Sequence, residues 1–135
     1  MKKILVIEDE DLIREAINLI LRVNGFDVIT AENGAKGIEL AKEHIPDMIV
    51  SDIMMPEKDG YEVLEALKNY PLTATLPFLF LSAKADKSDI RQGMNLGADD
   101  YLTKPFEHDQ LIAAVQTRLA KSEEIRKIAE KKLDD

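Results

Sequence analysis

The sequence predicts an α/β fold: a doubly wound, five-stranded parallel sheet between two layers of helices, five in all. Two patterns carry this prediction. Short continuous apolar runs, such as residues 4–7 and 78–81, are typical of strands that are covered on both faces. Between these runs, apolar residues recur at spacings of three and four, which is typical of helices with one packed side. Strands that alternate with helices favour parallel pairing through right-handed crossovers, and therefore three layers.

The expected strands, in chain order, are residues 4–7, 27–30, 48–50, 78–81 and 101–102. The second and the fifth are short and less uniformly apolar, so we expect them to be peripheral.

Helical patterns fill the intervals between the strands. Gly25 and Gly97 are suited to end the first and fourth helices, and Asn33 is suited to cap the second. Gly60 precedes the third helix, and we expect it to adopt a backbone conformation that other residues avoid. The last helix begins near Glu107 and meets no helix breaker before the end of the sequence.

The composition excludes several classes of function. The formal net charge is −8, which argues against direct binding of nucleic acid. There is no cysteine, so disulfides, thiolate metal sites and cysteine nucleophiles are excluded. No apolar run approaches the roughly 20 residues that a membrane span needs. We therefore expect a cytoplasmic protein that binds neither membrane nor nucleic acid through this segment.

Polar side chains that could take part in binding or catalysis stand where the strands end. Glu8 and Asp9 follow the first strand, Asp52 ends the third, Ser82 ends the fourth, and Lys104 follows the fifth. Ligands of open parallel sheets bind beyond the carboxyl ends of the strands. We therefore expect these residues, although distant in sequence, to converge on one pocket.

Such a pocket suits phosphoryl chemistry. Three adjacent carboxylates repel one another, and a hard divalent cation with oxygen ligands, Mg²⁺, relieves that repulsion. A lysine beside them adds a second positive charge, which can stabilise a phosphoryl group and its transition state. One carboxylate can then act as a nucleophile and form an aspartyl phosphate.

Over residues 2 to about 120 the sequence resembles the CheY-like receiver domain of bacterial two-component response regulators. The resemblance implies the flavodoxin-like strand order 2-1-3-4-5. The segments that carry it are Glu8-Asp9, Asp52, the turn 55–60, Ser82-Ala83, residues 97–101 and Lys104-Pro105-Phe106.

The resemblance also implies a role for each residue of the acidic pocket. Asp52 matches the phosphoacceptor, while Glu8, Asp9, Asp52 and the backbone carbonyl of Met54 match the Mg²⁺ ligands. Lys104 matches the residue that pairs with the phosphoryl oxygens. Asp often stands in the family where this sequence has Glu8, but Glu is also common there.

Other matched residues belong to the switch. Ser82 matches the hydroxyl that hydrogen-bonds the phosphoryl group, although threonine is more common there. Tyr101 matches the aromatic residue that turns inward on activation, and the Lys104–Pro105 bond is expected to be cis. The face that changes comprises the fourth helix, the fifth strand and the start of the fifth helix.

The implied partner is a sensor histidine kinase or a histidine phosphotransfer protein, and the chain is not a turnover enzyme. Met54 and Lys84 flank the acceptor site and offer no base for an attacking water, which favours slow self-dephosphorylation. Two other functions stay open. A phosphorylation-independent interaction module is one, and a Mg²⁺-dependent aspartyl-phosphate phosphohydrolase is the other. Against the second, Met54 stands where one phosphatase group keeps an acid/base Asp.

Residues 1–120 are the expected receiver domain, and residues 121–135 the expected helical extension or linker. Ile112, Leu119 and Leu133 share a heptad frame, which would suit a coiled-coil homodimer. Ser122 and Arg126 interrupt that seam, which favours a solvated tail, or a linker to a downstream output domain, instead.

Overall fold

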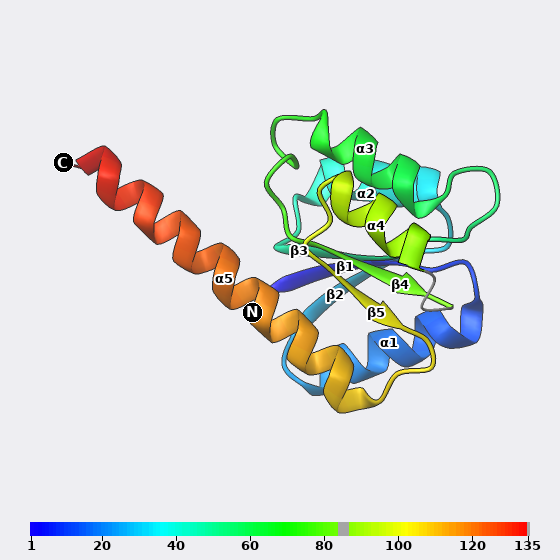
Figure 1. The fold of residues 1–135 in the computed structure, drawn as a ribbon. Helices are drawn as coiled ribbons and strands as arrows, with labels where there is room; N and C mark the ends of the chain where they lie inside the picture. The colour runs from blue at the N-terminus through cyan, green and yellow to red at the C-terminus, as the bar shows by residue number, and fades with distance from the viewer. Residues whose placement is uncertain (84–86, 135) are drawn as a thin grey trace.

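A computed structural model describes residues 1–83 and 87–134 as a parallel sheet covered by helices on both faces (Figure 1). The strands are β1 Lys3–Ile7, β2 Asp27–Ala31, β3 Met48–Asp52, β4 Phe78–Ser82 and β5 Asp100–Thr103. The helices are α1 Asp11–Val23, α2 Gly34–His44, α3 Gly60–Lys68, α4 Lys87–Asn95 and α5 His108–Asp134.

The strand order is β2-β1-β3-β4-β5, and every neighbouring pair is parallel. The predicted fold class and strand order are therefore confirmed, and β2 and β5 lie at the edges as expected. Both ends of each of the five strands lie within two residues of their predicted positions. The third and fourth strands run on through Ser51, Asp52 and Ser82, so polar residues continue the strands into the site.

Alternating side chains of the central strands build two cores. On one face, Leu5 and Ile7 pack with buried residues of α2 and α3. On the other face, Ile4 and Val6 pack with α1 and the first turns of α5. Figure 1 shows α2, α3 and α4 above the sheet and α1 and the start of α5 below it. β1 and β3 are covered by helices on both faces. Polar side chains of these strands can therefore reach solvent or a ligand only at the strand ends.

The ends of the helices follow the expected chemistry. The Asn33 side chain accepts a hydrogen bond from the Lys36 backbone N–H at 2.8 Å and so caps α2. Gly25 follows α1 with φ +89°, and Gly97 follows α4 with φ +108°. Both glycines adopt the left-handed conformation that ends a helix.

The prediction for Gly60 was wrong in its cause. The positive φ in this turn belongs to Glu57, at 67°, while Gly60 lies outside that region. A Cβ atom at Gly60 would instead meet the carbonyl oxygen of Asp52 at 2.5 Å and the ring of Phe80 at 2.9 Å. Glycine stands here because α3 begins in direct contact with the end of β3.

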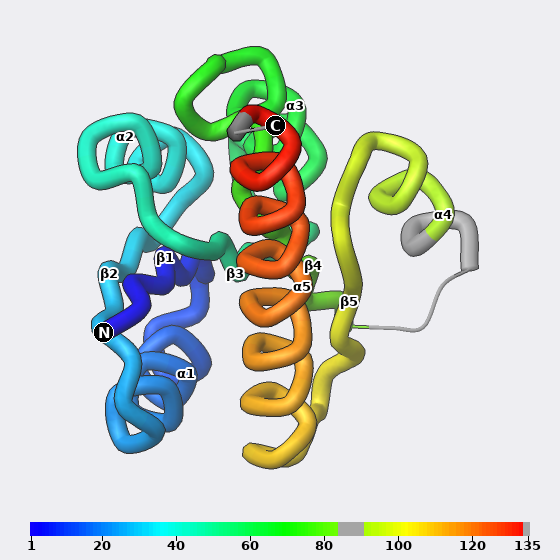
Figure 2. The backbone as a smooth tube through the Cα atoms, turned by 90° about the vertical axis from the view of Figure 1, so that its left-hand side faces the viewer, coloured from blue at the N-terminus to red at the C-terminus, as the bar shows by residue number. Residues whose placement is uncertain are grey.

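α5 has two parts along one continuous helix. Leu111 and Val115 are fully buried against the sheet, whereas Ile125 is 68% exposed and Leu133 is 86% exposed. Figure 2 shows the later turns crossing the edge of the sheet where the strands begin. A groove of about 490 Å³ separates these turns from that edge, with Pro77 and Asp99 in its lining. Within the described ranges, no helix combines the length and the apolarity that crossing a bilayer would require.

Candidate functional site

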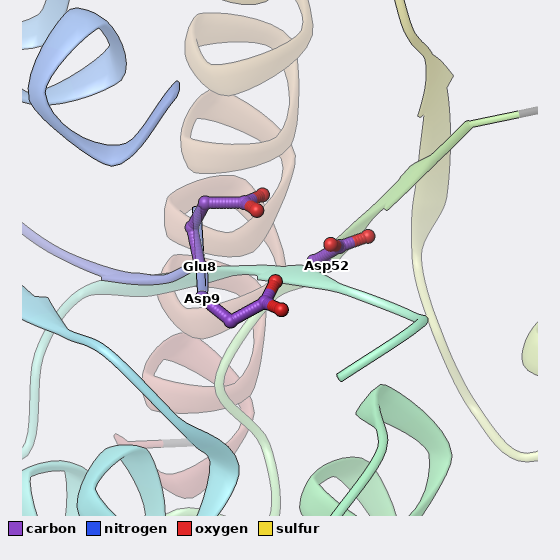
Figure 3. A group of neighbouring side chains, drawn as sticks. All are labelled: Glu8, Asp9 and Asp52. Atoms are coloured by element: carbon purple, nitrogen blue, oxygen red, sulfur yellow. The ribbon is translucent and has the colours of Figure 1, made fainter. Parts of the chain in front are cut away.

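The acidic residues predicted to converge do so at the carboxyl ends of β1 and β3. Glu8 directly follows β1, Asp9 begins the loop to α1, and Asp52 is the last residue of β3. One carboxylate oxygen from each lies within 4.8 Å of the others. Figure 3 shows the side chains of Glu8 and Asp9 extending toward the side on which Asp52 lies.

Lys104 reaches the same cluster from the loop after β5. Its Nζ atom lies 2.9 Å from Oε2 of Glu8 and 3.3 Å from Oδ2 of Asp52. The lysine side chain is only 14% exposed, so these ion pairs are shielded from solvent. The Lys104–Pro105 peptide bond that precedes α5 is cis.

Burial controls the electrostatics of the cluster. Glu8 is fully buried and Asp52 is 5% exposed. Desolvation raises the pKa of the Glu8 carboxyl to about 7, against the opposing hydrogen bond from Lys104. Burial likewise raises the pKa of Asp52, and Lys104 opposes that rise. Burial lowers the pKa of Lys104, but the hydrogen bond to Glu8 and the charge of Asp52 have the larger, opposite effect, so the pKa is raised overall. Burial therefore disfavours the ionised forms of Glu8 and Asp52.

The remaining predicted residues surround the cluster at different depths. Ser82 ends β4 and is 5% exposed, and it follows Leu81, the residue that pairs with Asp52 on the neighbouring strand. Tyr101 lies on the edge strand β5 and is 40% exposed. The side chain of Met54 is 71% exposed in the loop after β3. Lys84, which we linked to phosphoryl lifetime, lies outside the described residues.

Some residues that shape the site were not anticipated. Asp59 and Glu62 form a capping box at the start of α3, and the spacing of Asp-x-x-Glu could have indicated it. Arg14 on α1 donates from Nη1 to the backbone carbonyl of Glu8 at 2.9 Å. A contact between a side chain and a backbone carbonyl leaves no pattern in a single sequence.

The cluster fits a hard divalent cation. Its donor atoms are all carboxylate oxygens. Of the three residues, Asp9 alone is half-exposed, so a bound ion can retain water on that side. Among the described residues this is the group of acidic and imidazole side chains that could hold a metal ion.

Comparison with known proteins agrees with this geometry. Residues 4–116 match the family profile described as the response regulator receiver domain. The alkaline phosphatase synthesis transcriptional regulatory protein PhoP of Bacillus subtilis is 41% identical over 134 residues, which cover 99% of this chain and 55% of that protein. The chain thus spans about half the length of the curated relatives it matches.

Solved structures give the same result. A putative response regulator from Chloroflexus aurantiacus superposes with a TM-score of 0.85 at 36% identity, covering 88% of this chain and 98% of that one. The receiver domain of a sensor histidine kinase from Pseudomonas aeruginosa superposes with a TM-score of 0.82 at 27% identity, covering 88% and 98%. That structure has a magnesium ion coordinated in its active site cleft.

Proposed function

The chain belongs to the response regulator receiver domain family, and on this premise we propose that Asp52 accepts a phosphoryl group from a phosphohistidine donor. The observation that carries the proposal is the placement of Lys104 Nζ within 3.3 Å of Asp52 and 2.9 Å of Glu8. A cation beside a buried carboxylate is suited to balance the charge that a phosphoryl group brings.

We assign the metal to the acidic cluster. Glu8, Asp9, Asp52 and the backbone carbonyl of Met54 would hold Mg²⁺, which when bound supplies positive charge to the phosphoryl oxygens. The magnesium ion in the related Pseudomonas domain supports this assignment. Asp9 is the most accessible of the three carboxylates, and we propose it as a direct ligand.

The chemistry of the transfer uses residues of this chain. An Asp52 oxygen attacks phosphorus, the bond from phosphorus to the donor imidazole breaks, and a new P–O bond forms. Lys104 pairs with the phosphoryl oxygens, and the buried hydroxyl of Ser82 donates to one of them. The site stabilises its own phosphorylation, and relatives are response regulators, so we propose no turnover of external substrates. Slow self-dephosphorylation stays a prediction.

A switch follows from the exposure of Tyr101. This residue is 40% exposed at the sheet edge, one strand away from the end of β4. Engagement of Ser82 by the new phosphoryl group would draw the β4 end inward and open room for Tyr101 to follow. The altered face would be formed by α4, β5 and the start of α5.

The partner that delivers the phosphoryl group is proposed to be a sensor histidine kinase or a histidine phosphotransfer protein. Leu12, Ala16, Leu19 and Val23 lie on one face of α1 and are all exposed, Leu12 by 87%. This apolar stripe starts three residues after Asp9, so a helical partner packed on it would end beside the acidic cluster. A cytoplasmic location stays a prediction.

The relatives' names describe transcriptional regulators, and this chain spans about half of such proteins. We propose that this segment controls an output domain or protein, or a homodimer, through its switching face, without contacting DNA itself. The net charge of −8 supports the proposal that this segment does not contact DNA.

The test is the gain of mass with Mg²⁺ and a small phosphodonor such as acetyl phosphate. We expect one phosphoryl group on the parent chain and none on the Asp52→Ala variant. Turnover of a generic phosphate ester by the parent would favour the phosphohydrolase. No mass gain in the parent, with Mg²⁺ binding established, would favour the phosphorylation-independent module.

A further inference from the structure

Arg14 contacts the loop that carries two of the proposed metal ligands. Its Nη1 atom donates to the backbone carbonyl of Glu8 at 2.9 Å, and its Nη2 atom lies 2.6 Å from Oδ1 of Asp11. The Arg14 side chain is 17% exposed, whereas that of Asp11 is 83% exposed. Because an exposed ion pair contributes little, the shielded bond to the Glu8 carbonyl is the more consequential of the two.

The loop between β1 and α1 is short, and within it the Glu10 N–H donates to Oε1 of Glu8 at 3.2 Å. Only residues 8–10 lie between the end of β1 and the start of α1. The Glu8 N–H donates to the carbonyl of Ala31 at 3.0 Å, and the Glu8 carboxylate is held by Lys104. The carbonyl of Glu8 is the group that Arg14 holds, and this carbonyl belongs to the peptide that leads into Asp9.

We infer that Arg14 is a positioning residue for the metal site: by fixing the Glu8–Asp9 peptide, it directs the Asp9 carboxylate toward Asp52. This inference rests on the proposed function. The planar guanidinium suits the role because its fork holds the Glu8 carbonyl and Asp11 at once, tying the loop to the first turn of α1. Partners that orient metal ligands typically change metal affinity by about 10- to 100-fold when they are lost.

The charge of Arg14 makes the inference testable by sign. The positive charge of Arg14 repels Mg²⁺, so its removal alone should strengthen Mg²⁺ binding. Loss of positioning should weaken it. Arg14→Met therefore distinguishes a residue that orients the ligands from one that merely adds positive charge to the neighbourhood.

The same helix provides a matched control. Arg22 donates from Nη2 to the backbone carbonyl of Val28 at 2.8 Å and from Nε to the Asn18 side chain at 2.8 Å. It thus makes the same kind of contact to a carbonyl six residues away, but at the other end of α1 from the acidic cluster. Arg22→Met removes a comparable structural contact without touching the metal site.

The experiment is a calorimetric titration of the full chain with Mg²⁺, alongside thermal unfolding of each variant in EDTA. We expect Arg14→Met to bind Mg²⁺ at least about tenfold more weakly than the parent. Arg14→Lys, which retains the charge and can reach one acceptor, should fall between them. Arg22→Met should bind like the parent, even if its unfolding temperature falls as far as that of Arg14→Met.

The outcomes separate this inference from the proposal beneath it. If the parent binds Mg²⁺ and Arg14→Met binds equally well or more tightly, the positioning role is refuted while the metal site stands. An equal loss of affinity in Arg22→Met would also refute it, because general loosening of α1 would then explain both. Failure of the parent to bind Mg²⁺ would overturn the metal site itself, and the role of Arg14 with it. If Arg14→Met does not fold, Arg14→Lys carries the test.

Discussion

The two ends of the sheet both carry aspartates, but they use them differently. Where the strands begin, Asp47 accepts from the Lys3 N–H at 2.7 Å and donates its own N–H to the Lys3 carbonyl at 2.8 Å. Asp99 makes the same reciprocal pair with Phe78, at 2.7 and 2.9 Å. Where the strands end, carboxylates of Glu8, Asp9 and Asp52 face one another instead.

This difference shows how one residue type serves structure at one edge and chemistry at the other. A carboxylate that accepts a backbone N–H completes a strand's hydrogen bonding and holds the sheet together. A carboxylate that faces other carboxylates opposes folding, and its charge is relieved by a cation or by protonation.

The largest effect should come from Lys104→Met. Loss of this ammonium removes the cation beside Asp52, so phosphoryl uptake should fall by roughly 100- to 1,000-fold. Mg²⁺ should bind more tightly, because a competing positive charge has gone. Intact-mass kinetics and calorimetry measure the two effects, with Lys2→Met at the opposite edge as a control. Weaker Mg²⁺ binding in Lys104→Met would contradict this account of competition between the two cations.

The edges should also differ in their effect on stability. Asp99→Ala leaves the Phe78 N–H without its acceptor in a nearly buried position, so unfolding should become easier by about 2 kcal/mol. Asp99→Asn retains an acceptor and should lose less. Asp9→Asn, measured in EDTA, should stabilise the fold slightly because repulsion in the cluster falls. Urea unfolding gives all three values, and a stabilising Asp99→Ala would show that the two edges are alike.

A smaller effect concerns pH. The folded-state pKa of Glu8 is raised from 4.5 to about 7, so between these values the folded chain binds more protons than the unfolded chain. In EDTA, stability should therefore fall as pH rises from about 4.5 to about 7, by at most about 1.4 kcal/mol per pH unit for this group. The raised pKa of Asp52 acts in the same direction.

Urea unfolding across this pH range measures the slope, and Glu8→Gln should flatten it. Saturating Mg²⁺ should also flatten it, because the metal favours the ionised carboxylates. A slope that is the same in the parent and in Glu8→Gln would show that another group is responsible.

The smallest effect should come from removing residues 121–135. Their apolar side chains are largely exposed, with Ile125 at 68% and Leu133 at 86%, and they lie at the edge away from the acidic cluster. A chain that stops at Ala120 should keep the Mg²⁺ affinity and phosphoryl uptake of the parent. Calorimetry and mass spectrometry check this, and a substantial loss of either would move the proposed domain boundary beyond residue 120.

The sequence was sufficient for the fold because the relevant signals are local and periodic. The uniform apolar runs of β1 and β4 indicate strands covered on both faces, and that cover requires helices on each side. The convergence of Glu8, Asp52 and Lys104 followed from the topology, because parallel strands end at one edge.

Contacts between distant backbone atoms were beyond the reach of the sequence. Gly60 was expected to supply an unusual φ, but its role depends on the carbonyl of Asp52 lying where a Cβ would be. Nothing in the spacing around Arg14 distinguishes it, and its place beside the site follows only from its bond to the Glu8 carbonyl. Such contacts depend on tertiary placement to within an ångström, and residue types and spacing do not determine it.

The continuity of α5 has a mechanical consequence. The helix is clamped at Leu111 and Val115, begins four residues after Lys104, and then runs on as a single rod to Asp134. At 1.5 Å per residue, the stretch from Val115 to Asp134 is about 28 Å long, so a tilt of about 5° at the clamp displaces its tip by about 2.5 Å. A small rotation beside the proposed phosphorylation site is thereby amplified into a shift as large as the roughly 1–2 Å helix movements that accompany switching at protein interfaces.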